Sequence, residues 1–268
     1  MRILVICSSA VLLATADQAS AQSIESQTTE VRLSTGLDYT AGKYGMSDTT
    51  DILVGLTDIS LQQGNFLLSA SLPYLDIQGP ATIVAGAGGV PVAKRKAGVS
   101  VPLQPVTRTG WGDPNFGLTY SLSPEDLDGY AVDLTGVTKI ATANAAKGLS
   151  TGENDFGFSV DVSRQMGIWS PFVTFGYRVP GSSAAYSLNS APSFSVGTSV
   201  QLDQKIVAIF SYDFDGTISD TLADSQQFFA SASWIFSDRL TLTAYAEKGI
   251  SGGAPGIGTG LMLGWKLT

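Results

Sequence analysis

The chain has 268 residues, of which only 14% are Asp, Glu, Lys or Arg, whereas a typical soluble domain has about 25%. Its formal net charge of −8 argues against nucleic acid as a partner, because nucleic-acid binding requires a basic surface. Beyond the N-terminal segment no apolar run reaches the roughly 18 residues that a membrane-spanning helix needs, so any membrane crossing would have to be made by strands.

Residues 1–21 have the pattern of a secretory signal peptide. Arg2 precedes an apolar run over residues 3–13, and residues 19–21, Ala-Ser-Ala, supply the small side chains that signal peptidase accepts. We therefore expect export and a mature domain of residues 22–268; the alternative, a retained membrane anchor, would need a longer apolar run. The only cysteine, Cys7, lies inside this segment, so no disulfide framework is expected in the mature fold.

Residues 155–179 show the unit that we expect to repeat along the chain. Large apolar residues such as Phe158 and Val160 alternate with small or charged ones in 155–163, and the alternation resumes in 172–179 after a short turn at 164–167. A period of two places the two sets on opposite faces of a β-strand. Two strands of about ten residues joined by a tight turn are the building unit of a transmembrane β-barrel.

The same alternation predicts about twelve strands, with short and long connections in turn. The expected strands lie near residues 29–39, 51–61, 66–73, 116–122, 132–140, 155–163, 172–179, 194–202, 208–214, 228–236, 240–246 and 259–267. We expect the longest connection, 77–112, to be irregular. This pattern predicts an all-β fold, a transmembrane up-and-down antiparallel β-barrel with the tight turns and both termini on the periplasmic side.

A secreted soluble β-sandwich would show the same alternation, with the apolar face buried. Three features favour the barrel: the predicted signal peptide, the strand lengths near ten, and aromatic residues at the ends of the apolar stripes. The aromatics expected at the outer rim are Tyr39, Phe156, Tyr177, Phe194, Phe214 and Phe228, and those expected at the inner rim are Phe66, Tyr120, Tyr130, Trp169, Phe236 and Trp265.

The sequence lacks several of the residue types on which catalysis usually depends. The chain has no histidine, which excludes a Ser-His pair, and the mature part has no cysteine, which removes the thiol nucleophile and the ordinary zinc or copper ligands. We identify no catalytic, cofactor-binding or metal-binding residue, and we expect neither enzymatic activity nor a cofactor.

Charged residues of the polar stripes would point into the barrel if the apolar stripes face lipid. These candidate lumen-lining residues are Glu30, Arg32, Asp38, Asp133, Lys139, Asp155, Asp161, Arg178, Asp213, Asp215, Glu247 and Lys266. Two interpretations stay open at this point. The charges either form ion pairs that fill a narrow barrel, or they line a passage for small solutes and tune its selectivity.

A basic cluster lies in the predicted 77–112 connection. Its members are Lys94, Arg95, Lys96 and Arg108. They would bind lipopolysaccharide phosphates or attract anionic solutes at the outer rim, or else form an ordinary solvated loop surface.

Three segments, 110–124, 137–167 and 171–181, resemble the family of outer-membrane proteins associated with the meta-cleavage (MetA) pathway of phenol degradation. The resemblance is carried by Gly112-Asp113 before the fourth strand, Lys139 followed by Ala141-Thr142, and the Ser150-Thr151-Gly152 step before Asp155. Ala141 stands where the family usually has proline, and Ser150 where it often has glycine. The resemblance implies an outer-membrane barrel involved in the uptake of aromatic or other hydrophobic compounds, and it offers no catalytic residue.

Two functional hypotheses follow from these observations. The first is a monomeric barrel in the outer membrane of a Gram-negative bacterium, in contact with its lipid and lipopolysaccharide, that admits small, aromatic or hydrophobic solutes passively. The second is a structural or surface-interaction barrel whose outer loops bind lipopolysaccharide or a partner.

Overall fold

The structure, a computed structural model, describes residues 2–4, 13–15, 29–81, 83–85, 91–93, 105–181, 186, 188–220 and 222–268. Most of the predicted signal peptide and the whole of Lys94–Lys96 lie outside these residues. Two short strands, β1 (Arg2–Leu4) and β2 (Leu13–Thr15), pair with each other in a sheet of their own.

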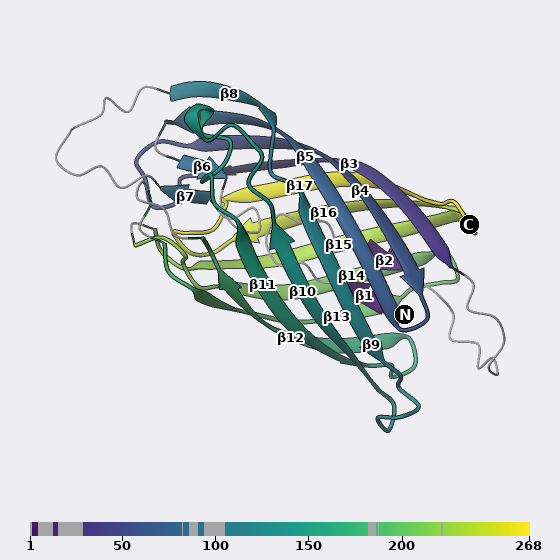
Figure 1. Ribbon diagram of the computed structural model, residues 1–268. Coiled ribbons are helices and arrows are strands. Elements are labelled where there is room, and N and C mark those ends of the chain that lie inside the picture. The colour runs from purple at the N-terminus through teal and green to yellow at the C-terminus, as the bar shows by residue number, and fades with distance from the viewer. Residues whose placement is uncertain are drawn as a thin grey trace.

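Twelve antiparallel strands close into a barrel in the described part of the chain (Figure 1). They are β3 (Glu30–Gly42), β4 (Thr50–Gln63), β5 (Phe66–Pro80), β9 (Asn115–Leu122), β10 (Tyr130–Lys139), β11 (Asp155–Arg164), β12 (Trp169–Val179), β13 (Ala191–Gln201), β14 (Ile206–Asp215), β15 (Ser225–Ser237), β16 (Leu240–Gly249) and β17 (Ile257–Lys266). Each strand pairs with the next in this order, and β17 pairs with β3, so the twelve strands form a closed ring. The predicted fold is thereby confirmed. No helix in the described residues is long and apolar enough to cross a membrane.

The two ends of the barrel differ. The end where β3 begins and β17 stops, here called the terminal end, carries the tight turns; the opposite end, here called the mouth, carries the long connections (Figure 1). That connection pattern is the one predicted from the sequence. The assignment of the terminal end to the periplasmic side stays a prediction.

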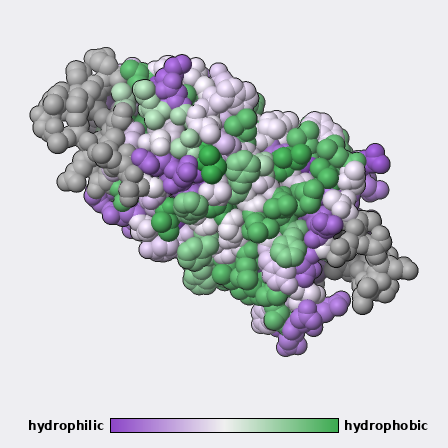
Figure 2. Space-filling model, in the orientation of Figure 1, coloured by the Kyte–Doolittle hydropathy of each residue, from purple (hydrophilic) through white to green (hydrophobic). Residues whose placement is uncertain are grey.

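The apolar stripes face outward and the charged stripes face inward. Phe158 and Phe175 are each 59% exposed, whereas Asp161 and Arg178 on the same two strands are only 7% and 9% exposed. Figure 2 shows the apolar side chains gathered across the middle of one face of the barrel, with polar residues toward its ends. An apolar outer wall of this extent around a polar interior is suited to lipid and not to water, so the soluble-sandwich alternative is wrong.

The aromatic residues predicted at the two rims lie near the corresponding ends of their strands. Several pair across neighbouring strands on the outer wall, with ring centroids 5.3 Å apart for Phe175 and Phe194 near the mouth and 5.0 Å apart for Phe66 and Tyr120 at the terminal end. Such pairs stabilise adjacent strands while placing amphipathic rings where lipid meets water.

The prediction that residues 77–112 form an irregular connection is wrong at both ends of that range. β5 continues to Pro80, and a further strand, β8 (Pro105–Trp111), pairs with its mouth-end half from Tyr74↔Trp111 to Pro80↔Pro105. The terminal-end half of β5 pairs instead with β9, from Phe66↔Tyr120 to Ser71↔Asn115. Pro73 lies where β5 changes partner, so the N–H that proline lacks is not needed for a bond between strands. The Pro73 carbonyl accepts from Gly112 N at 2.8 Å.

The connection between β5 and β8 also contains two short paired strands, β6 (Ile83–Ala85) and β7 (Pro91–Ala93). A single turn of 3-10 helix, η2 (Ala145–Lys147), follows β10. Asn144 caps this turn by accepting from Lys147 N at 3.0 Å, and Gly148 ends it in the left-handed conformation with φ of 73°. These segments lie at the mouth and shape the site described next.

Candidate functional site

The structure places the predicted charged residues in the barrel interior. Buried among them are Asp38, Lys139, Asp155, Asp161, Arg178, Asp213, Asp215 and Glu247. Asp133 lies directly opposite Asp161 on the neighbouring strand and is partly buried. The remaining three, Glu30, Arg32 and Lys266, form ion pairs with one another at the terminal end.

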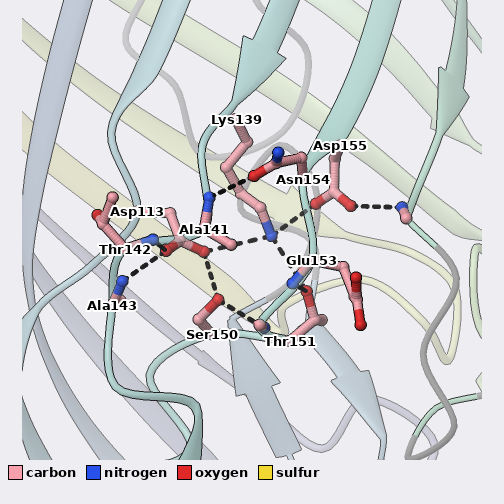
Figure 3. Close-up of polar contacts among 12 residues, drawn as sticks. Asp113, Lys139, Ala141, Thr142, Ala143, Ser150, Thr151, Glu153, Asn154 and Asp155 are labelled. Carbon is pink, nitrogen blue, oxygen red and sulfur yellow. Dashed lines mark hydrogen bonds and ion pairs between the residues drawn. The ribbon is translucent and has the colours of Figure 1, made fainter.

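At the mouth end of the interior, Lys139 is the centre of a buried polar network (Figure 3). Its Nζ lies 2.6 Å from Asp155 Oδ2 and 3.3 Å from Asp113 Oδ2, and it donates to Thr151 Oγ1 at 3.2 Å. Because one ammonium faces two carboxylates, the network is held by charge as well as by hydrogen bonds. We call this group the Lys139 network.

Asp113 and Asp155 extend the Lys139 network into the loops. Asp113 Oδ1 accepts from the backbone N–H groups of Thr142 and Ala143 at 2.9 and 2.8 Å, while its Oδ2 accepts from the Ser150 hydroxyl. Asp155 Oδ1 accepts from Gly181 N at 2.8 Å. The network therefore fixes the 140–154 connection and the end of β12 against the barrel wall, as Figure 3 shows for the first of these.

The residues that carry the family resemblance in the sequence are those of the Lys139 network. Asp113 was not among the predicted interior charges, although the Gly-Asp step was the available signal for it. The two departures from the family pattern each make a hydrogen bond here: Ala141 N donates to Asn154 Oδ1 at 2.8 Å, which a proline could not do, and the Ser150 hydroxyl reaches Asp113.

In the rest of the interior, acids outnumber bases. Arg178 forms an ion pair with Asp215. Within the described residues no ion pair engages six further acids, namely Asp38, Asp58, Asp133, Asp161, Asp213 and Glu247. Several of these have neutral donors instead, as when Tyr245 donates to Asp38 Oδ2 at 2.6 Å and Thr174 to Asp161 Oδ2 at 2.7 Å. The interior thus presents an excess of negative charge, and no group of three or more potential metal ligands is found in the described residues.

Beside the Lys139 network, part of the interior at the mouth is apolar, which the sequence did not predict. Leu75, Ile77 and Leu149 are buried against one another, with Ile52 and Val54 of β4 packed beside them. A second group, here called the mouth cluster, consists of Val84, Tyr186, Leu188, Ala191 and Ile218.

The mouth cluster spans the width of the barrel. Val84 follows β5, whereas Ala191 begins β13 and Ile218 follows β14, and β5 and β14 are six strands apart in a ring of twelve. Val84 of β6 therefore belongs to a buried apolar cluster whose other members come from the opposite side of the barrel. Sequence reasoning could not find this cluster, because it joins segments more than 100 residues apart with no shared periodicity.

Arg108, predicted as part of a basic cluster at the outer rim, instead lies partly buried beneath β6. Its Nη1 donates to the carbonyl oxygen of Ile83, and its Nη2 donates to that of Pro80 at 3.3 Å. The guanidinium therefore holds the chain where it turns inward from β5. The other three members of the predicted cluster, Lys94, Arg95 and Lys96, lie outside the described residues.

Comparison with known proteins agrees with this architecture. Residues 21–267 match the family described as "Putative MetA-pathway of phenol degradation". An outer membrane channel from Pseudomonas putida F1 aligns with 94% of this chain and 100% of its own at 12% identity and a TM-score of 0.64. The KdgM porin (5% identity, 88% of this chain and 99% of its own, TM-score 0.54) and the NanC porin (8% identity, 88% and 99%, TM-score 0.53) have the same fold. No curated protein sequence matches the chain.

Proposed function

We propose, from the premise that this chain belongs to the family of the putative MetA pathway of phenol degradation, that it is a monomeric outer-membrane barrel for passive uptake of small, apolar molecules such as aromatic compounds. The fold is that of outer-membrane channels and porins. The direction of insertion, with both termini in the periplasm, is part of this proposal.

The single observation that carries the proposal is that part of the mouth has an apolar lining. A barrel for polar solutes needs polar side chains inside it throughout its length. Here Ile52, Val54, Leu75 and Ile77 turn apolar side chains inward on the wall, and the buried mouth cluster joins Val84 to residues from the other side of the barrel. An apolar molecule leaving water would gain from contact with such a lining in proportion to the area that it buries, roughly 25 cal/mol per Å².

The small size of the solute follows from the packing of the interior. Eight of the twelve predicted charged residues are buried even though they face the inside of the barrel. Glycines accommodate large inward side chains: a Cβ at Gly197 would lie 2.6 Å from the ring of Phe172. An interior packed this closely leaves a path only for small molecules.

The excess of interior acids suits neutral or cationic solutes better than anions, because like charges in a confined interior repel strongly. The alternative role, a surface-interaction barrel with a basic outer loop, finds less support. Arg108 already has two carbonyl partners within the chain, which removes it from an exposed anion-binding surface.

The test measures the influx of the hydrophobic fluorophore N-phenyl-1-naphthylamine in Gram-negative cells that express the chain, where lipopolysaccharide limits its spontaneous diffusion. Cells with the folded barrel should show faster fluorophore influx than cells with the empty vector, and the hydrolysis rate of nitrocefin, a larger polar solute, should be unchanged. Equal fluorophore influx in both cultures, with folded barrel present in the outer membrane, would refute the proposal.

A further inference from the structure

Two buried hydrogen-bond donors at the mouth have no acceptor in the described part of the chain. Within the part of the chain that the structure describes, Arg108 Nε and the Tyr186 hydroxyl are both buried and have no hydrogen-bond partner. A buried donor without an acceptor costs about 1–3 kcal/mol, so such groups are rare unless a water or a ligand completes them.

The two donors belong to one site. Gly148 is the link: a Cβ built on it would lie 3.0 Å from Arg108 Nη1 and 3.4 Å from a methyl carbon of Val84. Val84 and Tyr186 are both buried members of the mouth cluster. Arg108 also acts on Tyr186 electrostatically: burial raises the pKa of this tyrosine and the guanidinium charge opposes the rise. The hydroxyl is therefore protonated at neutral pH and able to donate.

The surroundings of the donors are apolar on the remaining sides. Ala191, Ile218 and Leu188 complete the mouth cluster around Tyr186, and Ile83 is fully buried beside the carbonyl that Arg108 holds. A molecule that fits this site must bring an apolar body for the walls and an oxygen for the donors.

We propose that Arg108 Nε and the Tyr186 hydroxyl form a binding site at the mouth for a small, neutral, apolar molecule that carries one hydrogen-bond-accepting oxygen, such as an aromatic ketone. The inference rests on the proposed function, and it specifies that the transported solute carries a hydrogen-bond-accepting oxygen. It also explains why a guanidinium lies beside the apolar mouth cluster: two of its nitrogens hold the chain, and the third is left for the solute.

The charged groups around the site favour a neutral ligand. Arg108 is only partly buried, so water still solvates its charge and an anionic counterpart is not required. Elsewhere in the barrel interior, six acids without ion pairs in the described residues would repel an anion that tried to pass. A neutral acceptor meets both conditions.

The experiment uses the purified full chain in lipid nanodiscs and ¹⁹F NMR line broadening. The probe is 4-fluoroacetophenone, and the matched molecule without an acceptor is 1-ethyl-4-fluorobenzene. The ketone should bind saturably and at least several-fold more tightly than the hydrocarbon. Tyr186→Phe should weaken ketone binding about fivefold, the equivalent of one neutral hydrogen bond, and leave hydrocarbon binding unchanged.

Tyr130→Phe serves as the matched control, because Tyr130 lies at the terminal end and its hydroxyl accepts from Arg164 on the exposed surface. It should change neither affinity. Arg108→Lys, which keeps the charge but lacks Nε–H, should reproduce the loss of ketone binding. Equal affinity for the two probes, an unchanged affinity in Tyr186→Phe, or benzoate binding tenfold tighter than the ketone would overturn the inference; the second result would mean that the donors hold only water.

This binding assay does not depend on conduction, so the two proposals can fail separately. Ketone binding that depends on Tyr186, in a chain that does not speed fluorophore influx, would keep the site and remove the uptake function. Faster influx with no ketone binding would do the reverse.

Discussion

The Lys139 network makes a quantitative prediction about stability. Replacing Lys139 with methionine leaves Asp113 and Asp155 buried without their shared cation, and breaking a buried ion pair from one side typically costs about 3–5 kcal/mol. Both acids keep backbone N–H donors, from Thr142 and Ala143 for one and from Gly181 for the other. We therefore expect a loss near the lower end of that range, about 3 kcal/mol.

A second lysine in the same barrel supplies the comparison. Lys266 also pairs with an acid, Glu30, but its side chain is 35% exposed, against 6% for Lys139. Exposed pairs contribute about 0–1 kcal/mol, so Lys266→Met should cost no more than that. Lys139→Met combined with Asp155→Asn should recover part of the loss, because one of the two uncompensated charges is gone.

The assay is equilibrium unfolding in urea with the barrel in detergent micelles, followed by the faster gel migration of the unheated folded form. The reasoning predicts a clear order: wild type and Lys266→Met close together, Lys139→Met well below them, and the double variant between. It would be refuted if Lys139→Met cost no more than Lys266→Met, or if the double variant were less stable than Lys139→Met alone.

Three further predictions follow from the fold and the site. The only natural cysteine, Cys7, lies in the predicted signal peptide, so single cysteines can report the topology. Thr49→Cys at the mouth should react with a membrane-impermeant maleimide on intact cells, and Asp126→Cys at the terminal end should not. The reverse labelling would mean that the topology is inverted. Asp213→Asn combined with Glu247→Gln should lower the potassium-to-chloride permeability ratio in planar bilayers about twofold or more, measured from the reversal potential, whereas an unchanged ratio would show that these acids do not set selectivity. Ala141→Pro, which removes the donor to Asn154, should lower the unfolding free energy by about 1 kcal/mol in the same urea assay, and no change would mean that the bond contributes nothing.

The strands were predictable because lipid imposes a rule that each can satisfy locally. Phe158 and Phe175 must face lipid, and the residues next to them in the chain must face the interior. This requirement produces the alternation with a period of two that is visible in the sequence. β8 was missed because, in the described residues, it pairs only with the mouth-end half of β5. Its outward positions include Thr107 and Thr109 and show no continuous apolar stripe.

The site was predictable only in part. Inward charges such as Asp161 and Arg178 follow from the alternation, and Asp113 could have been found from the Gly-Asp step. The mouth could not be derived, because the presence of Val84 and Ile218 in one buried cluster depends on how the long connections fold. Arg108 was assigned to the rim on its charge alone, but its position is set by backbone carbonyls that the sequence does not display.

The most direct test of passage through the mouth compares one substitution on the two sides of the wall. Ala191→Trp adds a large ring to the mouth cluster, whereas Ala230→Trp adds the same ring on β15 at a position that follows the outward stripe of Phe228. With both variants folded in the outer membrane, Ala191→Trp should slow N-phenyl-1-naphthylamine influx several-fold toward the empty-vector rate and Ala230→Trp should leave it at the wild-type rate. Equal influx through the two variants would contradict a path through the mouth.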